Sequence, residues 1–463
     1  MSTKGIRDFR PELHYTPIMG WINDPNGMVY VDGVYHLCSQ YDPDVQHTGP
    51  LFWDHAISTD LIHWEHLPIA LTPDLKGFIF SGSAVYDKEN TSGFGKDGKA
   101  PIVAMFTYHH PSEDGVRSHD YEQQAIAYST DGVNFTKYEG NPVLPSRERD
   151  FRDPKVFPNP IKGGWSVATV AGDRVRFYHS TNLKDWEKTG EFGPEGNHSN
   201  GVWECPDIFP LEVNGGTKWV LLISMGPCKE NHGSRTQYFI GDFDGDAFTC
   251  DGRFNEVEFI DAGLDNYAGV TFSNTDERIL VGWASNWVYA VKTPTYDYCG
   301  CQTIPRMMTL VDTPKGGLRL ASKPVSDSFF TEGKPCDGTL PGEVFKLTVT
   351  GSGASAVTLA NDKGQTFVFG VNEENEAYID RRNAGAKDFD ENFADDWYSI
   401  NKAPRFYDGE WKLELTFDHS ISELFLDNGT RAFTQLHYPD TPYTTVTATG
   451  NAVVTIHTLK QTV

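Results

Sequence analysis

Three acidic residues of this sequence have surroundings that could support acid–base or nucleophilic chemistry. They are Asp24 in Trp21-Ile-Asn-Asp-Pro-Asn-Gly27, Asp153 in Phe151-Arg-Asp-Pro154, and Glu204 in Val202-Trp-Glu-Cys-Pro206. Cleavage of a glycosidic bond requires one carboxyl group that protonates the leaving oxygen, and one carboxylate that attacks or assists on the other face of the sugar. One permanently charged acid, one acid that holds a proton and one further carboxylate would meet this requirement together.

Each acid also has a purely structural interpretation. The residues around Asp24 are common in turns, so an Asx-turn is possible, although the Trp21 indole beside a fixed carboxylate would make a floor for a sugar ring. The adjacent Arg152 is expected to lower the pKa of Asp153 and keep it charged, but a surface ion pair would have the same spacing. The apolar neighbours of Glu204 favour the neutral carboxyl of a general acid, whereas a buried Glu–Arg pair is the alternative.

The elements that must position these acids are predicted to be β-strands. Aromatic residues are 13% of the chain, with 44 Gly and 27 Pro, which favours a turn-rich β protein. Helical periodicity is hard to find anywhere. The clearest strand-like runs are 27–38, which alternates in period two, and the apolar runs 102–108, 219–224 and 279–283.

A weak internal repeat indicates how the strands are organised. Three segments share Ser-Thr-Asp/Asn, three further residues and an aromatic ring, and a looser fourth copy follows; they are 58–64, 129–135, 180–186 and 241–248. Their starts are 71, 51 and 61 residues apart, which is the span of about four strands with turns. Such a period is typical of propeller blades, and about five blades fit residues 10–315. Chance recurrence of turn residues is the alternative.

The character of the chain changes after this region. We expect a catalytic propeller domain at 1–320, a loop-rich linker at 321–340, and a β-sandwich domain at 341–463. The sandwich is inferred from short alternating strands at 344–359, 366–371, 411–417 and 423–426. The predicted fold class is therefore all-β, with a five-bladed propeller followed by a sandwich.

Charge and cysteine content exclude several classes of protein. With 39 Lys+Arg and 64 Asp+Glu the formal charge is −25, so nucleic acid and membrane surfaces are not expected partners. The first nine residues lack the apolar core of a signal peptide, and the seven scattered cysteines do not form a disulfide framework. We therefore expect a soluble, cytoplasmic protein with reduced thiols. The sequence does not determine its oligomeric state.

Four ordered blocks resemble the signature of a known enzyme family. They are Trp21-Ile-Asn-Asp-Pro-Asn-Gly27, Phe80-Ser-Gly-Ser-Ala84, Phe151-Arg-Asp-Pro154 and Trp203-Glu-Cys-Pro-Asp207. They are similar to the blocks of glycoside hydrolase family 32, the β-fructofuranosidases that include invertases, inulinases and levanases. The opening block Phe9-Arg-Pro-Glu-Leu-His14 and the segment 418–425 extend the resemblance over nearly the whole chain.

The resemblance implies a retaining mechanism through a covalent fructosyl-enzyme intermediate. It implies that Asp24 is the nucleophile, that Glu204 is the acid/base, and that Asp153 stabilises the transition state. For retention, the carboxyl groups of nucleophile and acid should lie about 5 to 5.5 Å apart. No metal and no organic cofactor are implied. The substrate-binding residues implied are Asn23, Gln40, Trp53, Phe80, Ser81 and Arg152.

Two departures from the family pattern affect the expected specificity. Thr48 stands where many relatives have Trp, and Tyr298-Cys-Gly-Cys301 replaces a stretch that usually contains an arginine. The leading expectation is hydrolysis that releases terminal non-reducing β-D-fructofuranosyl units from a small carbohydrate, sucrose or fructo-oligosaccharide. Fructosyl transfer and endo-acting levanase or inulinase activity are alternatives on the same scaffold. A non-catalytic sugar-binding propeller is a remote alternative from a different class.

Overall fold

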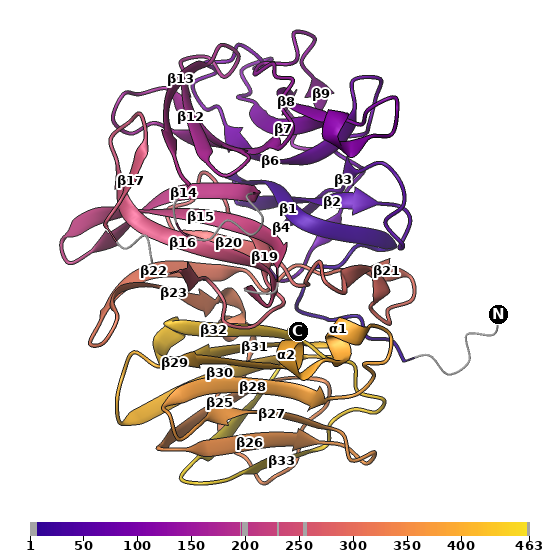
Figure 1. Ribbon diagram of the computed structural model, residues 1–463, viewed down its shortest axis with the longest axis vertical. Helices are drawn as coiled ribbons and strands as arrows, with labels where there is room; N and C mark the ends of the chain where they lie inside the picture. Colours follow the sequence, from indigo (N-terminus) through magenta and orange to yellow (C-terminus); the bar gives the residue numbers. More distant parts are fainter. Residues whose placement is uncertain (1–6, 195, 197–201, 229–230, 253–256, 461–463) are drawn as a thin grey trace.

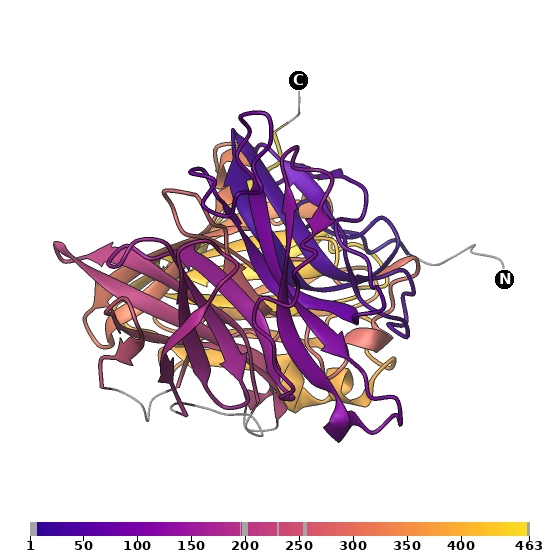
Figure 2. The same ribbon diagram turned by 90° about the horizontal axis from the view of Figure 1, so that it is seen from above.

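The computed structural model describes residues 7–194, 196, 202–228, 231–252 and 257–460. The expectation that no signal segment is present concerns residues 1–6 in part, and these lie outside the described residues. The described chain forms five sheets in its N-terminal part and two in its C-terminal part, and nearly all of their strand pairs are antiparallel. Figure 1 shows the five sheets stacked above the other two, and in Figure 2 the sandwich strands lie beneath the propeller sheets. Within this part of the chain, no helix has the length and apolar content that crossing a bilayer would require.

The five sheets are the blades of a β-propeller. Blade 1 contains β1 (Gly20–Val31), β2 (Val34–Asp42), β4 (Ala56–Ser58) and β5 (Glu65–His66), with β3 (Phe52–Trp53) and β21 (Tyr298–Cys299) beside them. Blade 2 contains β6 (Phe78–Tyr86), β7 (Ile102–His110), β8 (Tyr121–Ser129) and β9 (Thr136–Lys137). Blade 3 contains β10 (Phe151–Pro158), β11 (Trp165–Ala171), β12 (Val175–Ser180) and β13 (Glu187–Phe192).

The remaining two blades follow the same order. Blade 4 contains β14 (Trp203–Val213), β15 (Gly216–Cys228), β16 (Gly233–Phe243) and β17 (Phe248–Cys250), with β18 (Glu258–Phe259) beside β16. Blade 5 contains β19 (Tyr267–Thr271), β20 (Ile279–Trp283), β22 (Arg306–Thr313) and β23 (Gly317–Pro324). The first strands of the blades contact one another in the closed order β1, β6, β10, β14, β19 and β1 again. These inner strands therefore surround a common axis.

The sequence repeat corresponds to one turn that recurs in successive blades. In blades 1 to 3, the Ser hydroxyl at the end of the third strand and the Asp or Asn two residues later accept backbone N–H groups of the turn. The chain then enters the short fourth strand. The blade interpretation of the repeat is therefore confirmed by the strand order.

Two sequence runs that resemble single strands are hairpins instead. Run 27–38 contains the turn at Asp32 and Gly33, where φ is 50° and 89°, and run 344–359 is divided by a turn at Gly353, where φ is 64°. Positive φ ends a strand because the backbone no longer continues the extended ladder. Alternation of apolar and polar residues continues through such a tight turn, so the pattern alone does not reveal it.

The C-terminal region is a sandwich of two antiparallel sheets. One sheet orders β24 (Lys334–Pro335), β34 (Val453–Thr458), β25 (Val344–Ser352), β30 (Glu410–Asp418), β31 (Ile421–Leu426) and β32 (Arg431–Leu436). The other orders β29 (Ile400–Pro404), β28 (Glu376–Asn383), β27 (Thr366–Val371), β26 (Ser355–Ala360) and β33 (Thr445–Ala448). Their inner faces share one apolar core, in which Phe345 and Phe417 stack at 4.8 Å.

Short helical segments occupy the connections. The two α-helices are α1 (Glu391–Ala394) and α2 (Asp396–Ser399), and Asp390 and Asp395 accept backbone N–H groups at their starts. The 3-10 turns are η1 (Arg117–His119), η4 (Ala290–Lys292), η5 (Val325–Phe329) and η6 (Asp427–Gly429). Residues 388–396, which are rich in Asp and Glu, are therefore partly helical, and two of their carboxylates cap the helices.

A buried ionic network joins the propeller to the sandwich. Arg306 of β22 is 1% exposed and binds Asp261 and also Glu423 of β31. His14 lies between Asp418, at 2.7 Å from its Nδ1, and Glu423, at 3.3 Å from its Nε2. Burial alone would lower the pKa of His14, but the bonds to the two carboxylates outweigh it and raise the pKa to about 9. His14 is therefore a charged partner in the domain interface at neutral pH.

The raised pKa of His14 makes stability depend on pH. Because the folded pKa of about 9 lies above the ordinary histidine pKa of 6.5, the contribution of His14 is fully present below about pH 6.5 and is lost as the pH rises through about 9. We expect the stability advantage of wild type over His14→Asn to shrink across this range, by about 2–4 kcal/mol in the free energy of unfolding. Urea denaturation from pH 6 to 10 measures it.

The control is His63→Asn, which removes an exposed imidazole that pairs with Asp60 at the surface. Its stability relative to wild type should stay nearly constant over the same range. If wild type and His14→Asn showed the same dependence of unfolding free energy on pH, the contacts of this interface would not be what raises the pKa of His14.

Candidate active site

All five inner strands carry a β-bulge, and the residues of interest lie at these bulges. The ladder shifts register between Ile22 and Pro25, Phe80 and Gly82, Arg152 and Lys155, Glu204 and Asp207, and Tyr267 and Val270. A bulge bends the strand and re-aims a side chain. Asp153, Cys205 and Ala268 have φ of 60°, 46° and 54° at these points. Five equivalent bulges thus direct side chains from five blades toward the axis.

Asp24 of β1 receives three hydrogen bonds on its carboxylate. Ser81 Oγ donates to Oδ2 at 2.6 Å, Cys205 Sγ donates to the same oxygen at 3.3 Å, and Asn23 Nδ2 donates to Oδ1 at 3.1 Å. The Trp21 indole donates to Asn23 Oδ1 at 2.9 Å. Donors from three blades therefore fix both oxygens of Asp24.

Trp21 does not form the sugar-binding floor that its neighbours suggested. Its side chain is fully buried, so no sugar ring of a substrate can stack on it. It packs against Trp283 and holds Asn23 in place instead. An indole next to a polar turn can therefore orient a neighbouring amide without touching substrate.

Asp153 of β10 lies deeper in the site than Asp24. It is 6% exposed, and its Oδ2 accepts the backbone N–H of Cys205 at 2.9 Å. Its own N–H donates to Thr107 Oγ1 at 3.0 Å. Asp153 and Cys205 both have positive φ, a strained backbone conformation typical of functional sites.

Glu204 of β14 is held by two donors. Arg152 Nη2 donates to its Oε1 at 3.0 Å, and the Tyr267 hydroxyl donates to its Oε2. The other guanidinium nitrogen of Arg152 binds Glu122 at 3.0 Å and Asp150 at 2.8 Å. The Glu204 side chain keeps 25% exposure, so this carboxyl faces the open part of the site.

The three carboxyl groups affect one another electrostatically. Burial raises the pKa of Asp24, the charge of Glu204 raises it further, and the bonds from Ser81 and Asn23 oppose the rise. Burial also raises the pKa of Asp153 to about 8, with Arg152 opposing the rise and the charges of Asp24 and Glu204 adding to it. The expectation that Arg152 keeps the pKa of Asp153 low is wrong, because burial outweighs the opposing charge of Arg152.

One cavity of about 310 Å³ contains the three acids. Of the binding residues implied by the sequence, five line it: Asn23, Gln40, Phe80, Ser81 and Arg152. Gln40 is 2% exposed, and its Nε2 has no partner among the described residues, so a donor points into an enclosed polar space. Trp53 does not line the cavity. It is 1% exposed, and its indole donates to the Phe80 carbonyl at 3.2 Å.

Other lining residues were not found from the sequence. They are His47, Leu51, His109, Arg117, Asp120, Glu122, Arg149, Asp150, Tyr267 and Trp287. His47 stacks on Trp21 at 4.9 Å, next to the Thr48 position where relatives have a ring. His109 stacks flat on Phe80 at 4.2 Å and approaches Glu122 at 3.2 Å. In the sequence, the replacement of the relatives' Trp by Thr48 pointed to this part of the cavity and so to the neighbouring His47. No motif singled out Glu122 or Tyr267.

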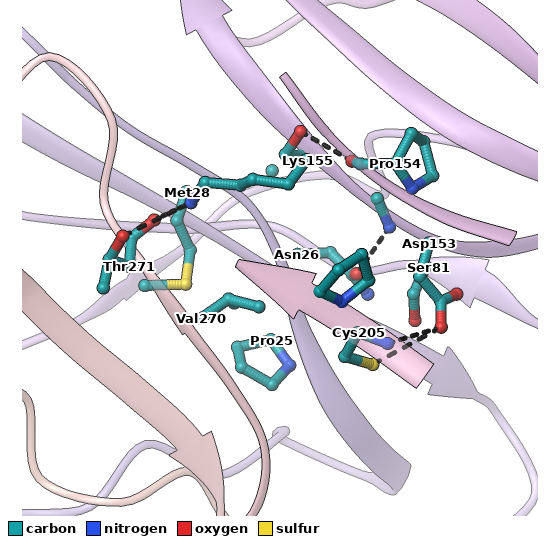
Figure 3. Close-up of a pocket in the computed structure, with 14 residues that line it drawn as sticks. Pro25, Asn26, Met28, Ser81, Asp153, Pro154, Lys155, Cys205, Val270 and Thr271 are labelled. Carbon is teal, nitrogen blue, oxygen red and sulfur yellow. Dashed lines mark hydrogen bonds between the residues drawn. The ribbon is translucent and has the colours of Figure 1, made fainter. Parts of the chain in front are cut away.

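A second, very small cavity continues along the inner strands from the acids. Its volume is about 20 Å³, enough for about one water molecule. Its lining includes Pro25, Asp153 and Cys205, and Lys155 crosses it to donate to the Thr271 carbonyl at 2.6 Å (Figure 3). Lys155 also pairs with Asp207 at 3.1 Å. The axis is therefore closed beyond the acids, and the catalytic cavity has a blind end.

Comparison with known proteins identifies the family. The N-terminal domain model of glycosyl hydrolases family 32 matches residues 14–324, and the C-terminal model matches residues 330–462. The chain belongs to glycosyl hydrolase family 32. This family 32 chain is 39% identical to a levanase of Bacillus subtilis, over 94% of this chain and 67% of the levanase. It is 36% identical to an extracellular exo-inulinase of Aspergillus awamori, over 96% of this chain and 92% of the relative.

Solved structures of the family have the same fold. The exo-inulinase of Aspergillus awamori superposes with a TM-score of 0.88 at 32% identity, covering 99% of both chains. A fructofuranosidase of Schwanniomyces occidentalis in complex with fructose superposes with a TM-score of 0.86 at 29% identity, covering 99% of both chains. The family 32 enzyme described here is thus a glycosidase built as a five-bladed propeller with a C-terminal sandwich.

The carboxyl cluster predicts the basic limb of the pH profile. Coupled groups lose protons in steps that belong to the cluster, and the last step lies near pH 8, the pKa of Asp153. Because a cluster without protons cannot protonate a leaving group, kcat/KM of the family 32 enzyme should fall above about pH 8. Removing one negative charge with Asp153→Asn should move this limb to lower pH.

Initial rates from pH 5 to 10 test this. The matched control is Asp380→Asn, which changes a carboxylate that pairs with Arg382 at the surface of the sandwich. Its profile should coincide with that of wild type. A limb that stays in place or moves to higher pH in Asp153→Asn would contradict the coupling.

Proposed function

We propose that this enzyme releases terminal non-reducing β-D-fructofuranosyl units from sucrose and fructo-oligosaccharides by a retaining double displacement. The observation that carries the proposal is the placement of three carboxyl groups with different surroundings in one blind cavity. Asp24 is held by three donors, Glu204 by Arg152 and Tyr267, and Asp153 is the most deeply buried. The similar proteins include a levanase, an exo-inulinase and an invertase, and these activities support the substrate class.

In the first step Asp24 acts as the nucleophile. Its carboxylate attacks the anomeric carbon while Glu204 gives its proton to the leaving oxygen, so the glycosidic bond breaks as the fructosyl–Asp24 ester forms. Ser81, Asn23 and Cys205 orient the attacking carboxylate. Asp153, together with Gln40, binds the fructose hydroxyls, so the oxocarbenium-like transition state is held in a fixed orientation.

In the second step Glu204 acts as the base. It takes a proton from water, the water oxygen bonds to the anomeric carbon, and the bond to Asp24 breaks. The donors on Glu204 keep it in position for both steps, because Arg152 Nη2 and the Tyr267 hydroxyl each hold one oxygen. Two inversions at the same carbon retain its configuration.

Burial favours removal of terminal units over cleavage within a chain. Asn23, Gln40 and Ser81 are each 5% exposed or less, and the axis beyond them is closed by Lys155 and Asp207. A sugar ring bound at the Asp24 end of the cavity therefore leaves no room for a further sugar unit beyond it. Glu204, with 25% exposure, faces the side from which the rest of the substrate extends.

Two variants test the assigned roles. Asp24→Ala should lower kcat on sucrose by about 10⁴-fold or more, since no intermediate can form. Glu204→Ala should lower it by about 10²–10⁴-fold and should accumulate enzyme one fructosyl unit heavier, detectable by mass spectrometry, with a substrate whose leaving group needs no proton. Asp380→Ala, at the sandwich surface, is the control for folding and should retain full activity.

The products distinguish the alternatives. Free fructose from sucrose, kestose, inulin and levan supports hydrolysis of terminal units. Longer oligosaccharides at high sucrose would show that transfer dominates, and oligosaccharides released from polymer would show endo action. Full activity of Asp24→Ala and Glu204→Ala would overturn the mechanism.

We also propose that the enzyme works in the cytoplasm. The seven cysteines are all free thiols, and Cys205 uses its sulfur as a donor to Asp24, which requires it to stay reduced. Fractionation of the source cells with an antibody to the enzyme tests this. Co-fractionation with cytoplasmic markers is expected, and recovery from the culture medium would contradict it.

A further inference from the structure

The side of the catalytic cavity beyond Glu204 contains charged residues that the mechanism does not use. Arg152 links Glu204 to Asp150 and Glu122, and all four residues line the same cavity. Arg149 follows at 3.5 Å from Asp150, and Arg117 and Asp120 complete this wall. Because Glu204 marks the position of the leaving oxygen, this wall faces the part of the substrate attached to the fructosyl unit.

Arg117 is the unusual member of this wall. Its guanidinium makes no hydrogen bond, ion pair or ring contact with any residue in the described part of the chain. Asp120, three residues later, is engaged by the Ser112 N–H at 2.9 Å and lies 3.8 Å from His109. The chain has 64 acidic and 39 basic residues, yet the Arg117 guanidinium binds none of the carboxylates of this wall. It therefore remains available as a donor to a ligand.

The loop that carries Arg117 is preformed. It joins β7 to β8 and includes η1, whose purple turn lies at the edge of the propeller in Figure 2. Ser112 donates its hydroxyl to the Val116 carbonyl at 2.9 Å, and His119 Nδ1 lies 2.8 Å from Asp114 Oδ2. These bonds hold the loop on both sides of Arg117, and neither of them involves the Arg117 side chain. A preformed donor needs less ordering when a ligand binds.

The charge of this wall favours a neutral ligand. Arg117, Arg149 and Arg152 face Asp120, Glu122, Asp150 and Glu204, so the formal charges are three positive and four negative. A phosphate group would meet four acids and only three bases. Vicinal sugar hydroxyls can both donate and accept, so they fit a wall in which guanidinium forks alternate with carboxylates.

We propose that Arg117 and Arg149 form a binding subsite for the neutral sugar attached to the scissile fructosyl unit, the glucosyl group of sucrose or the next fructosyl unit of an oligosaccharide. This inference rests on the proposed function. Both arginines bind hydroxyls of the leaving sugar and take no part in the bond changes at the anomeric carbon. They therefore determine which leaving groups the enzyme prefers.

Substrates with and without a leaving sugar test the subsite. Arg117→Ala and Arg149→Ala should each raise KM for 1-kestose and sucrose by about tenfold, the loss expected for one hydrogen bond from a charged donor, with kcat changed little. Hydrolysis of methyl β-D-fructofuranoside, whose leaving group is methanol, should be unchanged in both variants. Arg117→Lys, which keeps the charge without the planar fork, should show an intermediate KM.

Arg382→Ala, at the surface of the sandwich, is the matched control and should behave as wild type on all substrates. Equal losses on methyl fructofuranoside and kestose, or no loss on either, would overturn the subsite. A loss confined to phosphorylated sucrose would overturn its assignment to a neutral sugar. Wild-type enzyme that cleaves neither compound would instead overturn the proposed function, and the inference with it.

Discussion

The structure depends on holding three carboxyl groups in one cavity. Asp24, Asp153 and Glu204 come from three blades, and like charges at close range in a low dielectric repel strongly. The protein counters this repulsion with donors aimed at each carboxylate: Ser81 and Asn23 at Asp24, Cys205 N–H at Asp153, and Arg152 with Tyr267 at Glu204. Burial still raises the pKa of Asp153 to about 8, so one proton remains in the cluster near neutral pH and reduces its negative charge.

The propeller provides these donors through its bulges. A regular inner strand would alternate its side chains between its two faces, whereas the bulge at each inner strand changes the direction of a side chain toward the axis. Positive φ at Asp153, Cys205 and Ala268 costs about 1–2 kcal/mol at each position. Packing of five blades around the closed axis, including the buried Lys155–Asp207 pair, holds these conformations in place.

The sandwich is connected to Asp24 through hydrogen bonds. Glu423 of the sandwich accepts the Ile304 N–H at 2.8 Å and binds Arg306, which fixes the segment that also contains Gln302. Gln302 Nε2 then donates to the Asn23 carbonyl at 2.7 Å, and Asn23 donates to Asp24. The second domain therefore helps to fix the backbone beside Asp24, although none of its described residues lines the cavity.

The sequence by itself determined the all-β class, the blade repeat, the family blocks and the three acids, because turn residues and short motifs are local in the chain. It did not determine which neighbours meet each acid. Arg152 next to Asp153 binds Glu204 instead, Trp21 and Trp53 are buried under the site rather than exposed in it, and Tyr267, Glu122 and Arg117 carry no motif. Those outcomes depend on bulges and on contacts between blades, since only the closed ring brings residues more than a hundred positions apart within hydrogen-bonding distance.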